Sequence, residues 1–304
     1  MIRILFTIIA AMLAVAWGLV FWGPDQTSVL CWWFVMFFSL AGVIFTVFSL
    51  VLVAIRVIRK KLPETSLFLL LIVSMIAAWP AGWFMGYGRI AYPSDAEKTQ
   101  PSVSIRLPVD QSVIVAWGGN PVEQNFHATF PFERWAYDLL AQPAALKTPN
   151  LEEYGIFGQT VLAPIDGTVI GIRNDVPDLP AGTELNNSDI RSMLGNYIFL
   201  RIDETNTYLV MAHLMADSVT VKQGQHVSEG MPIARVGNSG NTSEPHIHIH
   251  HQRQDPSTTN FFLAKGLPLF FREIDGPPMP TGGVGIVDGR EVPIGMTISP
   301  LKKK

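Results

Sequence analysis

Three long apolar stretches near the N-terminus constrain the fold of this 304-residue chain more than any other feature. They are Ile4–Trp22, Val29–Ile55 and Leu67–Tyr87, and each meets the requirement of about 20 apolar residues for a helix that crosses a bilayer. The first could instead be a cleaved signal peptide. Its apolar region, however, exceeds the roughly 7–15 residues of such peptides, and a second stretch follows at once. We therefore predict that residues 1–89 form a membrane anchor of three transmembrane helices.

The positions of basic residues predict how these helices are oriented. The segment Arg56–Lys61 (RVIRKK) lies between the second and third stretches, whereas the loop between the first two has no basic residue. Loops rich in lysine and arginine tend to stay in the cytoplasm. This predicts a multi-pass protein of the cytoplasmic (inner) membrane whose C-terminal part lies on the extracytoplasmic side. No charged residue lies in the middle of a stretch, which argues against a channel or transporter.

The rest of the chain has the pattern of an all-β protein. Residues 90–112 contain proline, serine and charged residues and are predicted to be a linker. From Val113, short apolar runs alternate with Gly, Pro, Asn and Asp, which predicts a β-sandwich-like domain over 113–275. Residues 276–304 form an extension with a possible hairpin at Asp288–Gly289 and a basic tail. The expected strands are Val113–Trp117, Ala136–Leu140, Thr168–Ile172, Tyr197–Ile202, Tyr208–His213, Ile233–Val236 and His246–His250.

Charge and cysteine content exclude several functions for this part of the chain. Six of the 22 lysines and arginines but only two of the 25 aspartates and glutamates precede Ile90, which leaves residues 90–304 with a formal charge of −7. Nucleic-acid binding requires a basic surface and is therefore not expected. The single cysteine, Cys31, lies in an apolar stretch, so the β part has no cysteine ligand or thiol nucleophile. Residues 173–195 interrupt the strands and are expected to form a surface loop, with a short helix at 188–194.

Four of the seven histidines lie within the six residues 246–251 (HIHIHH). On a β-strand, alternate side chains point to the same face, so His246, His248 and His250 are expected on one face and His251 on the other. Two imidazoles about 7 Å apart along a strand can converge on one metal ion. A catalytic zinc site usually has three protein ligands and one open position, so further ligands must come from elsewhere in the chain.

Four separate segments resemble the lysostaphin/LytM-type zinc metallopeptidases of peptidase family M23, which cut peptidoglycan peptides. They are APIDGTVI (163–170), MAHL (211–214), VKQGQHVSEGMPIARVG (221–237) and GNSGNTSEPHIHIH (237–250). They occur in the order that the family has, and the resemblance covers about residues 113–252. Two of these segments also resemble biotinyl/lipoyl carrier domains, but the modifiable lysine of a carrier hairpin is missing between them.

The resemblance implies that His127, Asp138 and His248 bind Zn²⁺ and that His213 and His246 are the catalytic histidines. Two neutral imidazoles and one carboxylate would leave one coordination position free for water. The metal would polarise the scissile carbonyl, and the two catalytic histidines would transfer protons and stabilise the tetrahedral intermediate.

This sequence departs from the family pattern at two places. The family's first motif usually places its aspartate four residues after its histidine, whereas Asp138 follows His127 by eleven. Glu133 is a nearer carboxylate, but we prefer Asp138 because its apolar neighbours predict a strand with one inward acid. His250 stands where the family often has glutamate. We expect it at the rim of the site, with a hydrogen-bonding role for the metal ligand as the alternative.

The sequence thus predicts a membrane-anchored zinc metalloendopeptidase that hydrolyses peptide bonds in peptidoglycan or in another extracytoplasmic polypeptide. The alternative is a catalytically inactive module that binds the cell wall or regulates other hydrolases. His226 and His251 are expected to be exposed and to take no part in the site. The sequence identifies no protein partner.

Overall fold

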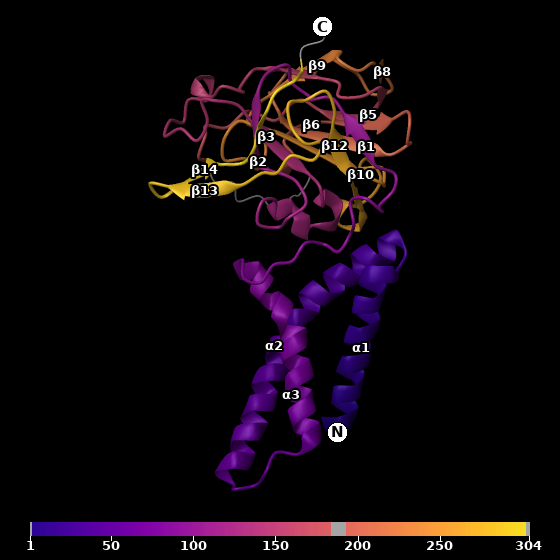
Figure 1. Ribbon diagram of the computed structural model, residues 1–304, viewed down its shortest axis with the longest axis vertical. Coiled ribbons are helices and arrows are strands. Elements are labelled where there is room, and N and C mark those ends of the chain that lie inside the picture. Colours follow the sequence, from indigo (N-terminus) through magenta and orange to yellow (C-terminus); the bar gives the residue numbers. More distant parts are fainter. Residues whose placement is uncertain (1, 184–192, 302–304) are drawn as a thin grey trace. The chain divides into compact units, whose positions relative to one another are not determined.

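The computed structural model describes residues 2–183 and 193–301, which form two compact units that divide between Pro93 and Ser94. The first unit is helical and the second is built mainly of β-strands (Figure 1). The short helix expected at 188–194 lies largely outside the described residues, as does the basic tail Lys302–Lys304.

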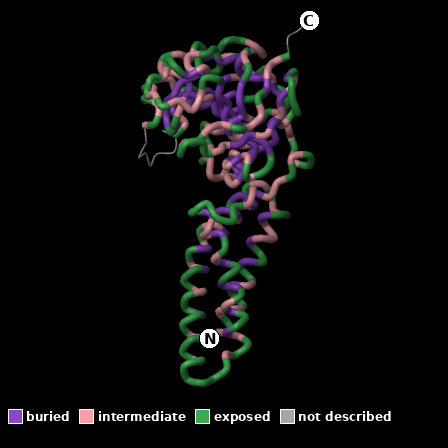
Figure 2. The backbone as a smooth tube through the Cα atoms, turned by 60° about the vertical axis from the view of Figure 1, so that its left-hand side comes forward, coloured by how far each residue is buried: buried purple, intermediate pink, exposed green. Residues whose placement is uncertain are grey.

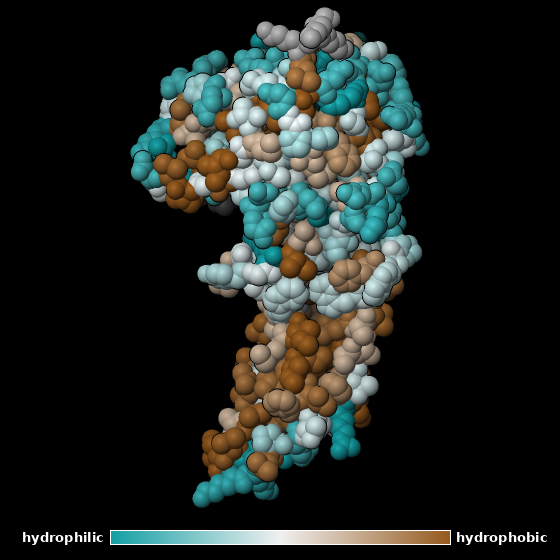
Figure 3. Space-filling model, viewed as in Figure 1, coloured by the Kyte–Doolittle hydropathy of each residue, from teal (hydrophilic) through white to brown (hydrophobic). Residues whose placement is uncertain are grey.

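The helical unit consists of α1 (Ile2–Trp22), α2 (Asp25–Ile58) and α3 (Thr65–Ala78), the last continued by the 3-10 helix η1 (Trp79–Met85). All three spans are long and apolar enough to cross a membrane. Apolar side chains cover the outside of these helices (Figure 3), among them those of Ile44 and Phe68. In water such a surface would be costly, because burying apolar area is the main driving force of folding. The three predicted apolar stretches therefore form three helices, which suggests membrane anchoring.

Close packing joins α2 to α3 at Gly42. A Cβ atom at this position would lie 2.5 Å from the backbone of Ala77 and Ala78, so only glycine allows the helices to approach this closely. Small residues at such contacts are typical of membrane helices, whose association depends on van der Waals packing. Near the start of α2, the hydroxyl of Ser28 contacts the Val20 carbonyl oxygen and the Tyr92 hydroxyl, both at 2.6 Å.

One nine-stranded sheet dominates the second unit, in the order β15-β2-β3-β10-β7-β6-β5-β8, with β11 as a further partner of β10. Every pairing in this sheet is antiparallel. Its strands are β2 (Val113–Trp117), β3 (Tyr137–Leu140), β5 (Gly167–Arg173), β6 (Asn196–Ile202), β7 (Tyr208–Leu214), β8 (His226–Val227), β10 (Ile247–Gln252), β11 (Gly266–Leu267) and β15 (Thr297–Ile298). All the expected strands but one therefore belong to a single sheet; the exception, at 233–236, is β9.

Three strand pairs complete this unit: β1 (Val103–Ile105) with β12 (Leu269–Phe271), β4 (Thr160–Leu162) with β9 (Pro232–Arg235), and β13 (Val284–Val287) with β14 (Arg290–Pro293). The expectation of a β-sandwich is thus imprecise, because one large sheet is accompanied by short pairs and by 3-10 helices. These helices are η2 (Phe126–Thr129), η3 (Pro131–Glu133), η4 (Leu151–Glu153) and η5 (Phe261–Leu263).

A large hydrophobic core lies against one face of the large sheet, and Figure 2 shows buried residues concentrated in the middle of this unit. Alternate residues of the central strands supply it, such as Ile247 and Ile249 of β10 and Leu209 and Met211 of β7. This is the alternation that a half-buried strand requires. The opposite face of the same strands is consequently available for polar side chains.

Both segments that flank the predicted domain contribute to its structure. In the expected linker 90–112, β1 pairs in parallel with β12, and its residues Val103 and Ile105 belong to the core. The ordered unit therefore begins before Val113. In the C-terminal extension, β13 and β14 form the expected hairpin around Asp288–Gly289, where both residues have positive φ, and β15 adds an edge strand to the sheet beside β2.

Candidate metal centre and active site

Asp138 and His248 lie directly opposite each other on the adjacent antiparallel strands β3 and β10. Directly opposed residues project from the same face of a sheet, and here Asp138 Oδ1 lies 2.9 Å from His248 Nδ1. Both side chains are buried, while their chain neighbours Tyr137 and Ile247 point into the hydrophobic core. The alternation that buries the apolar residues therefore also brings this carboxylate and imidazole together.

His127 reaches the pair from the segment between β2 and β3. It lies in η2, its Nε2 is 3.6 Å from Asp138 Oδ2, and its ring centroid is 5.0 Å from that of His248. The two 3-10 helices η2 and η3 occupy the residues that separate His127 from Asp138, so the eleven-residue spacing still brings them together. Ligand atoms of His127, Asp138 and His248 all lie within 4.8 Å of one another.

His213 and His246 lie beside this group. Their ring centroids are 4.6 Å apart, and His246 Nε2 is 3.7 Å from Asp138 Oδ1. His213 has a φ of +61°, a left-handed conformation that is uncommon for any residue except glycine. Backbone strain of this kind concentrates at functional sites. The structure thus brings together all five residues that the resemblance implied, and their individual roles stay predictions.

The protonation of His127 follows from its neighbour Asn125. The Asn125 amide group donates to the carbonyl oxygens of Gly119 and Ala136, at 2.9 and 3.2 Å, so its Oδ1 is left to accept a hydrogen bond. His127 Nδ1 lies 3.1 Å from this oxygen and therefore carries the proton. The unprotonated Nε2 then faces the Asp138 carboxylate, an arrangement that is favourable when a cation lies between them.

His213 and His246 are held in the same way by backbone carbonyl groups. His213 Nδ1 donates to the Ser239 oxygen and His246 Nδ1 to the Glu244 oxygen, each at 2.9 Å. A carbonyl oxygen can only accept, so each neutral ring has its proton on Nδ1 and a free lone pair on Nε2. Both rings are therefore fixed in orientation and able to accept a proton through Nε2.

The electrostatics of the site favour neutral His127 and His213 beside an ionised Asp138. Burial lowers the pKa of His127 to about 3 and that of His213 well below its ordinary value. Burial alone would raise the pKa of Asp138, but the adjacent histidines hold it below its usual range. Burial would lower the pKa of His248, but its hydrogen bond to Asp138 raises it. A positive charge is thus favoured beside Asp138, as a site for a divalent metal requires.

A second carboxylate, Glu133 of η3, approaches the other side of His248. Its Oε1 lies 3.7 Å from His248 Nε2, and burial raises its pKa to about 7. Glu133, His248 and His250 form a second group whose ligand atoms lie within 4.8 Å of one another. The two carboxylates therefore flank opposite nitrogens of one ring, and only Asp138 also approaches His127 and His246.

The expectations for the remaining histidines are partly wrong. His250 is only 3% exposed and His251 only 1%, although we expected the first at the rim and the second in solvent. Burial follows because β3 and β11 pair with successive parts of one edge of β10 while β7 covers the other edge. His251 Nε2 lies 2.7 Å from the Thr207 hydroxyl. His226 is exposed, as predicted, and pairs with Asp203.

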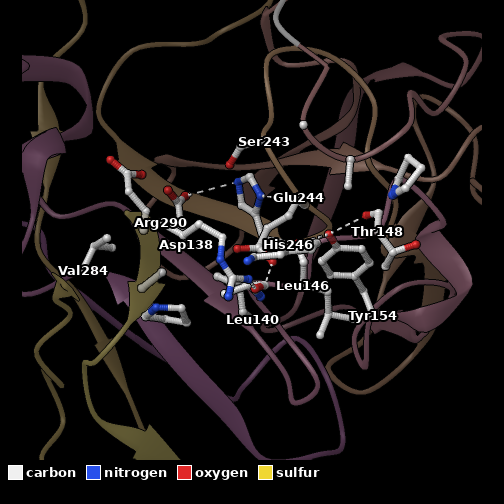
Figure 4. A pocket seen from close by; sticks show the side chains of 18 of the residues that line it. Asp138, Leu140, Leu146, Thr148, Tyr154, Ser243, Glu244, His246, Val284 and Arg290 are labelled. Atoms are coloured by element: carbon white, nitrogen blue, oxygen red, sulfur yellow. Dashed lines mark hydrogen bonds and ion pairs between the residues drawn. The ribbon is translucent and has the colours of Figure 1, made fainter. Parts of the chain in front are cut away.

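An open cleft of about 450 Å³ adjoins the candidate metal centre. In Figure 4, Asp138 and His246 lie between the hairpin residues Val284 and Arg290 on one side and Tyr154 on the other. The lining mixes apolar, basic and acidic side chains, as a cleft for an extended polypeptide would. The hairpin β13–β14 of the C-terminal extension thus forms one wall of this cleft.

Comparison with protein-family models assigns part of the chain. Residues 154–259 match the model of peptidase family M23. These residues form a peptidase family M23 domain. The match includes β4 to β10 and with them His213, His246 and His248, whereas His127 and Asp138 precede it. The unusual first motif therefore lies outside the part of the chain that the family model matches.

Several solved structures are similar to part of the chain. Lysostaphin from Staphylococcus simulans is 18% identical over 51% of this chain and 47% of its own, with a TM-score of 0.31. The catalytic domain of the prophage-encoded M23 protein EnpA from Enterococcus faecalis is 16% identical over 44% of this chain and 73% of its own, with a TM-score of 0.29. A zinc-containing peptidase from Vibrio cholerae is 23% identical over 49% of this chain and 36% of its own, with a TM-score of 0.33. The chain thus spans about half of the length of the lysostaphin structure, and no curated protein sequence matches it.

Gln252, a buried residue near the site, was not predicted to take part in it, and for His250 a hydrogen bond to the metal ligand was only the alternative to a place at the rim. Gln252 and His250 follow His248 at intervals of two along β10, so the same alternation that united the histidines extends to them. That spacing was the available signal. The end of β10 was expected to be exposed because its burial depends on β11, which the sequence pattern did not predict.

Proposed function

We propose that this protein is a membrane-anchored zinc endopeptidase that hydrolyses peptide bonds in peptidoglycan peptides outside the cytoplasmic membrane. The observation that carries the proposal is the convergence of His127, Asp138 and His248, with His213 and His246 beside them. The M23 domain supports a peptidase, and the three apolar helices support an anchor. The basic segment between α2 and α3 supports an extracytoplasmic location for the domain.

His127 Nε2, the Asp138 carboxylate and His248 Nδ1 would hold the Zn²⁺. Two neutral imidazoles and one carboxylate match the ligands of catalytic zinc sites, which keep a fourth position for water or substrate. Bound there, zinc supplies a Lewis acid that polarises the scissile carbonyl and lowers the pKa of a bound water toward ~7. The unprotonated Nε2 of His127 and the raised pKa of His248 beside Asp138 both fit a cation at this position.

His213 and His246 would move the protons of the reaction. Each ring is oriented by a backbone carbonyl at Nδ1, so its neutral form has an unprotonated Nε2. A neutral imidazole can take the proton of the attacking water, then donate it to the leaving amine and hydrogen-bond the oxyanion meanwhile. Burial keeps His213 neutral at neutral pH. His246 lines the open cleft and is therefore the residue that would touch substrate directly.

The alternative, an inactive module that binds the wall or regulates other hydrolases, has one observation in its favour. His127 and Asp138 lie before the residues that the family model matches, and their spacing departs from the family pattern. Loss of metal ligands would be expected in such a module. All five positions instead hold residues able to bind metal or transfer protons, and we therefore favour the enzyme.

Digestion of purified peptidoglycan tests this proposal. The full-length protein in detergent is incubated with insoluble peptidoglycan, and release of soluble fragments with new free amino groups is followed over time. We expect release by the wild type and almost none by the His246→Ala variant. If the wild type binds the polymer and releases no amino groups, the regulatory module replaces the enzyme.

A further inference from the structure

The face of β10 that carries His248 continues with two polar residues that the proposed mechanism does not use. His250 and Gln252 are 3% and 1% exposed, so both are removed from water almost completely. Buried polar groups are costly unless they are hydrogen-bonded, and these two are bonded to each other and to His248. The result is a chain of hydrogen bonds that ends at a candidate metal ligand.

A backbone carbonyl at the far end of this series of hydrogen bonds determines which atom donates in each of them. Gln252 Nε2 donates to the Gln254 oxygen at 2.6 Å, and because a carbonyl only accepts, the orientation of the Gln252 amide is determined. Gln252 Oε1 consequently faces His250 Nε2 at 3.0 Å and can only accept. His250 therefore carries its proton on Nε2.

The tautomer of His250 in turn determines which nitrogen of His248 donates to it. His250 donates through Nε2 to Gln252 Oε1, so in the neutral ring the other nitrogen, Nδ1, has a free lone pair. That nitrogen lies 2.9 Å from His248 Nε2, which must therefore donate the proton between them. The other nitrogen of His248, Nδ1, lies 2.9 Å from Asp138 Oδ1, and a bound metal would take the place of the proton that these two atoms share.

We propose that His250 and Gln252 are positioning residues that hold His248 in the tautomer that binds the metal through Nδ1. This inference rests on the zinc site of the proposed function. Metal-bound histidines generally donate their second ring N–H to a fixed acceptor, which sets the ring orientation and increases its basicity. In this protein the acceptor is another histidine, whose own tautomer is set by Gln252.

Glu133 and His250 could instead hold a second metal ion together with His248, but the distances favour a shared proton. Two zinc–nitrogen bonds of about 2.0–2.1 Å at a tetrahedral angle separate their nitrogens by about 3.3 Å. The 2.9 Å between His248 Nε2 and His250 Nδ1 is the ordinary length of a hydrogen bond. Glu133, at 3.7 Å from the same nitrogen, is a more distant acceptor.

Zinc affinity of the full-length protein in detergent tests the proposal. The metal is removed with a chelator, and the dissociation constant for zinc is measured by competition with a chromophoric chelator. We expect His250→Leu to bind zinc about 10- to 100-fold more weakly than the wild type. His250→Gln, which can still accept from His248 and donate to Gln252, should restore most of the affinity. The visible spectrum of the Co²⁺-substituted protein should change in His250→Leu and return toward that of the wild type in His250→Gln.

The matched control is His251→Leu, the same substitution at the next residue, which is equally buried but faces away from the site. It should lower thermal stability and leave zinc affinity unchanged. An equal loss of affinity in both leucine variants, or none in His250→Leu, would overturn the proposal. So would a second zinc per chain that disappears in both His250→Leu and Glu133→Gln. A folded wild type that binds no zinc would overturn the proposed function and this inference with it.

Histidine-selective ¹⁵N NMR of the wild type measures the tautomer of His250 directly. We expect His250, assigned from the spectrum of His250→Gln, to be neutral with its proton on Nε2. A proton on Nδ1 of His250 would reverse the direction of the chain and contradict the proposal.

Discussion

The two faces of β10 differ in function although they share a strand, a residue type and the same degree of burial. His250 and His251 are neighbours, both are nearly inaccessible, and both are hydrogen-bonded through each ring nitrogen. His250 connects to a candidate metal ligand, whereas His251 lies on the face of Ile247 and Ile249 and bonds to Thr207 and a backbone carbonyl. Neither burial nor residue type therefore separates a functional histidine from a structural one, and the pleat of the strand does.

The largest expected effect is on the rate of peptidoglycan hydrolysis, after a substitution on the side of the site. Replacing His246 by alanine removes a proton-transfer group, which typically contributes about 10²–10⁴-fold to the rate. We expect that loss in peptidoglycan hydrolysis, with zinc content kept at the wild-type level because His246 is not a proposed ligand. A variant that loses zinc together with activity would assign His246 to the metal instead.

Stability should respond most strongly on the opposite face. Ile249 is fully buried in the core, and its replacement by alanine removes packed methyl groups and leaves a cavity. The free energy of unfolding of the β unit should fall by about 2–5 kcal/mol, measured by denaturant titration with near-ultraviolet circular dichroism. Zinc affinity below the unfolding transition should remain unchanged. A weakened affinity would show that the two faces are not independent.

The smallest expected effect is on how stability depends on pH. Burial lowers the pKa of His251 to about 4, below its value of about 6.5 in the unfolded chain. The unfolded chain therefore binds a proton between these pH values that the folded protein does not. Stability should consequently decrease as the pH falls from about 6.5 to 4, and His251 contributes up to ~1.4 kcal/mol per pH unit. His251→Gln should make this dependence shallower in denaturant titrations at several pH values, and an unchanged slope would contradict this assignment.

Local patterns predicted the parts of the fold that depend on a single element. The apolar stretches correspond to α1, α2 and α3, and the alternation over 246–251 placed His248 and His250 on one face of β10, directly after His246. These features follow from the 3.6- and two-residue periods of helix and strand. They require no knowledge of which segments meet in space.

Features that depend on distant segments could not be predicted in this way. The approach of His127 to Asp138 requires η2 and η3, and the burial of His250 requires β11 to pair with the end of β10. The pairing of β1 with β12 likewise joins residues more than 160 positions apart. Tertiary pairing of this kind has no local signal in the sequence, and it decided which predicted residues became part of the site.

Zinc content of the full-length protein tests the central claim most directly. The wild type is compared with Asp138→Ala and with Glu133→Gln, a matched change at the other carboxylate that contacts His248. We expect about one zinc per chain in the wild type and in Glu133→Gln, and almost none in Asp138→Ala. Zinc retained in Asp138→Ala and lost in Glu133→Gln would contradict the account and place the metal on the other side of His248.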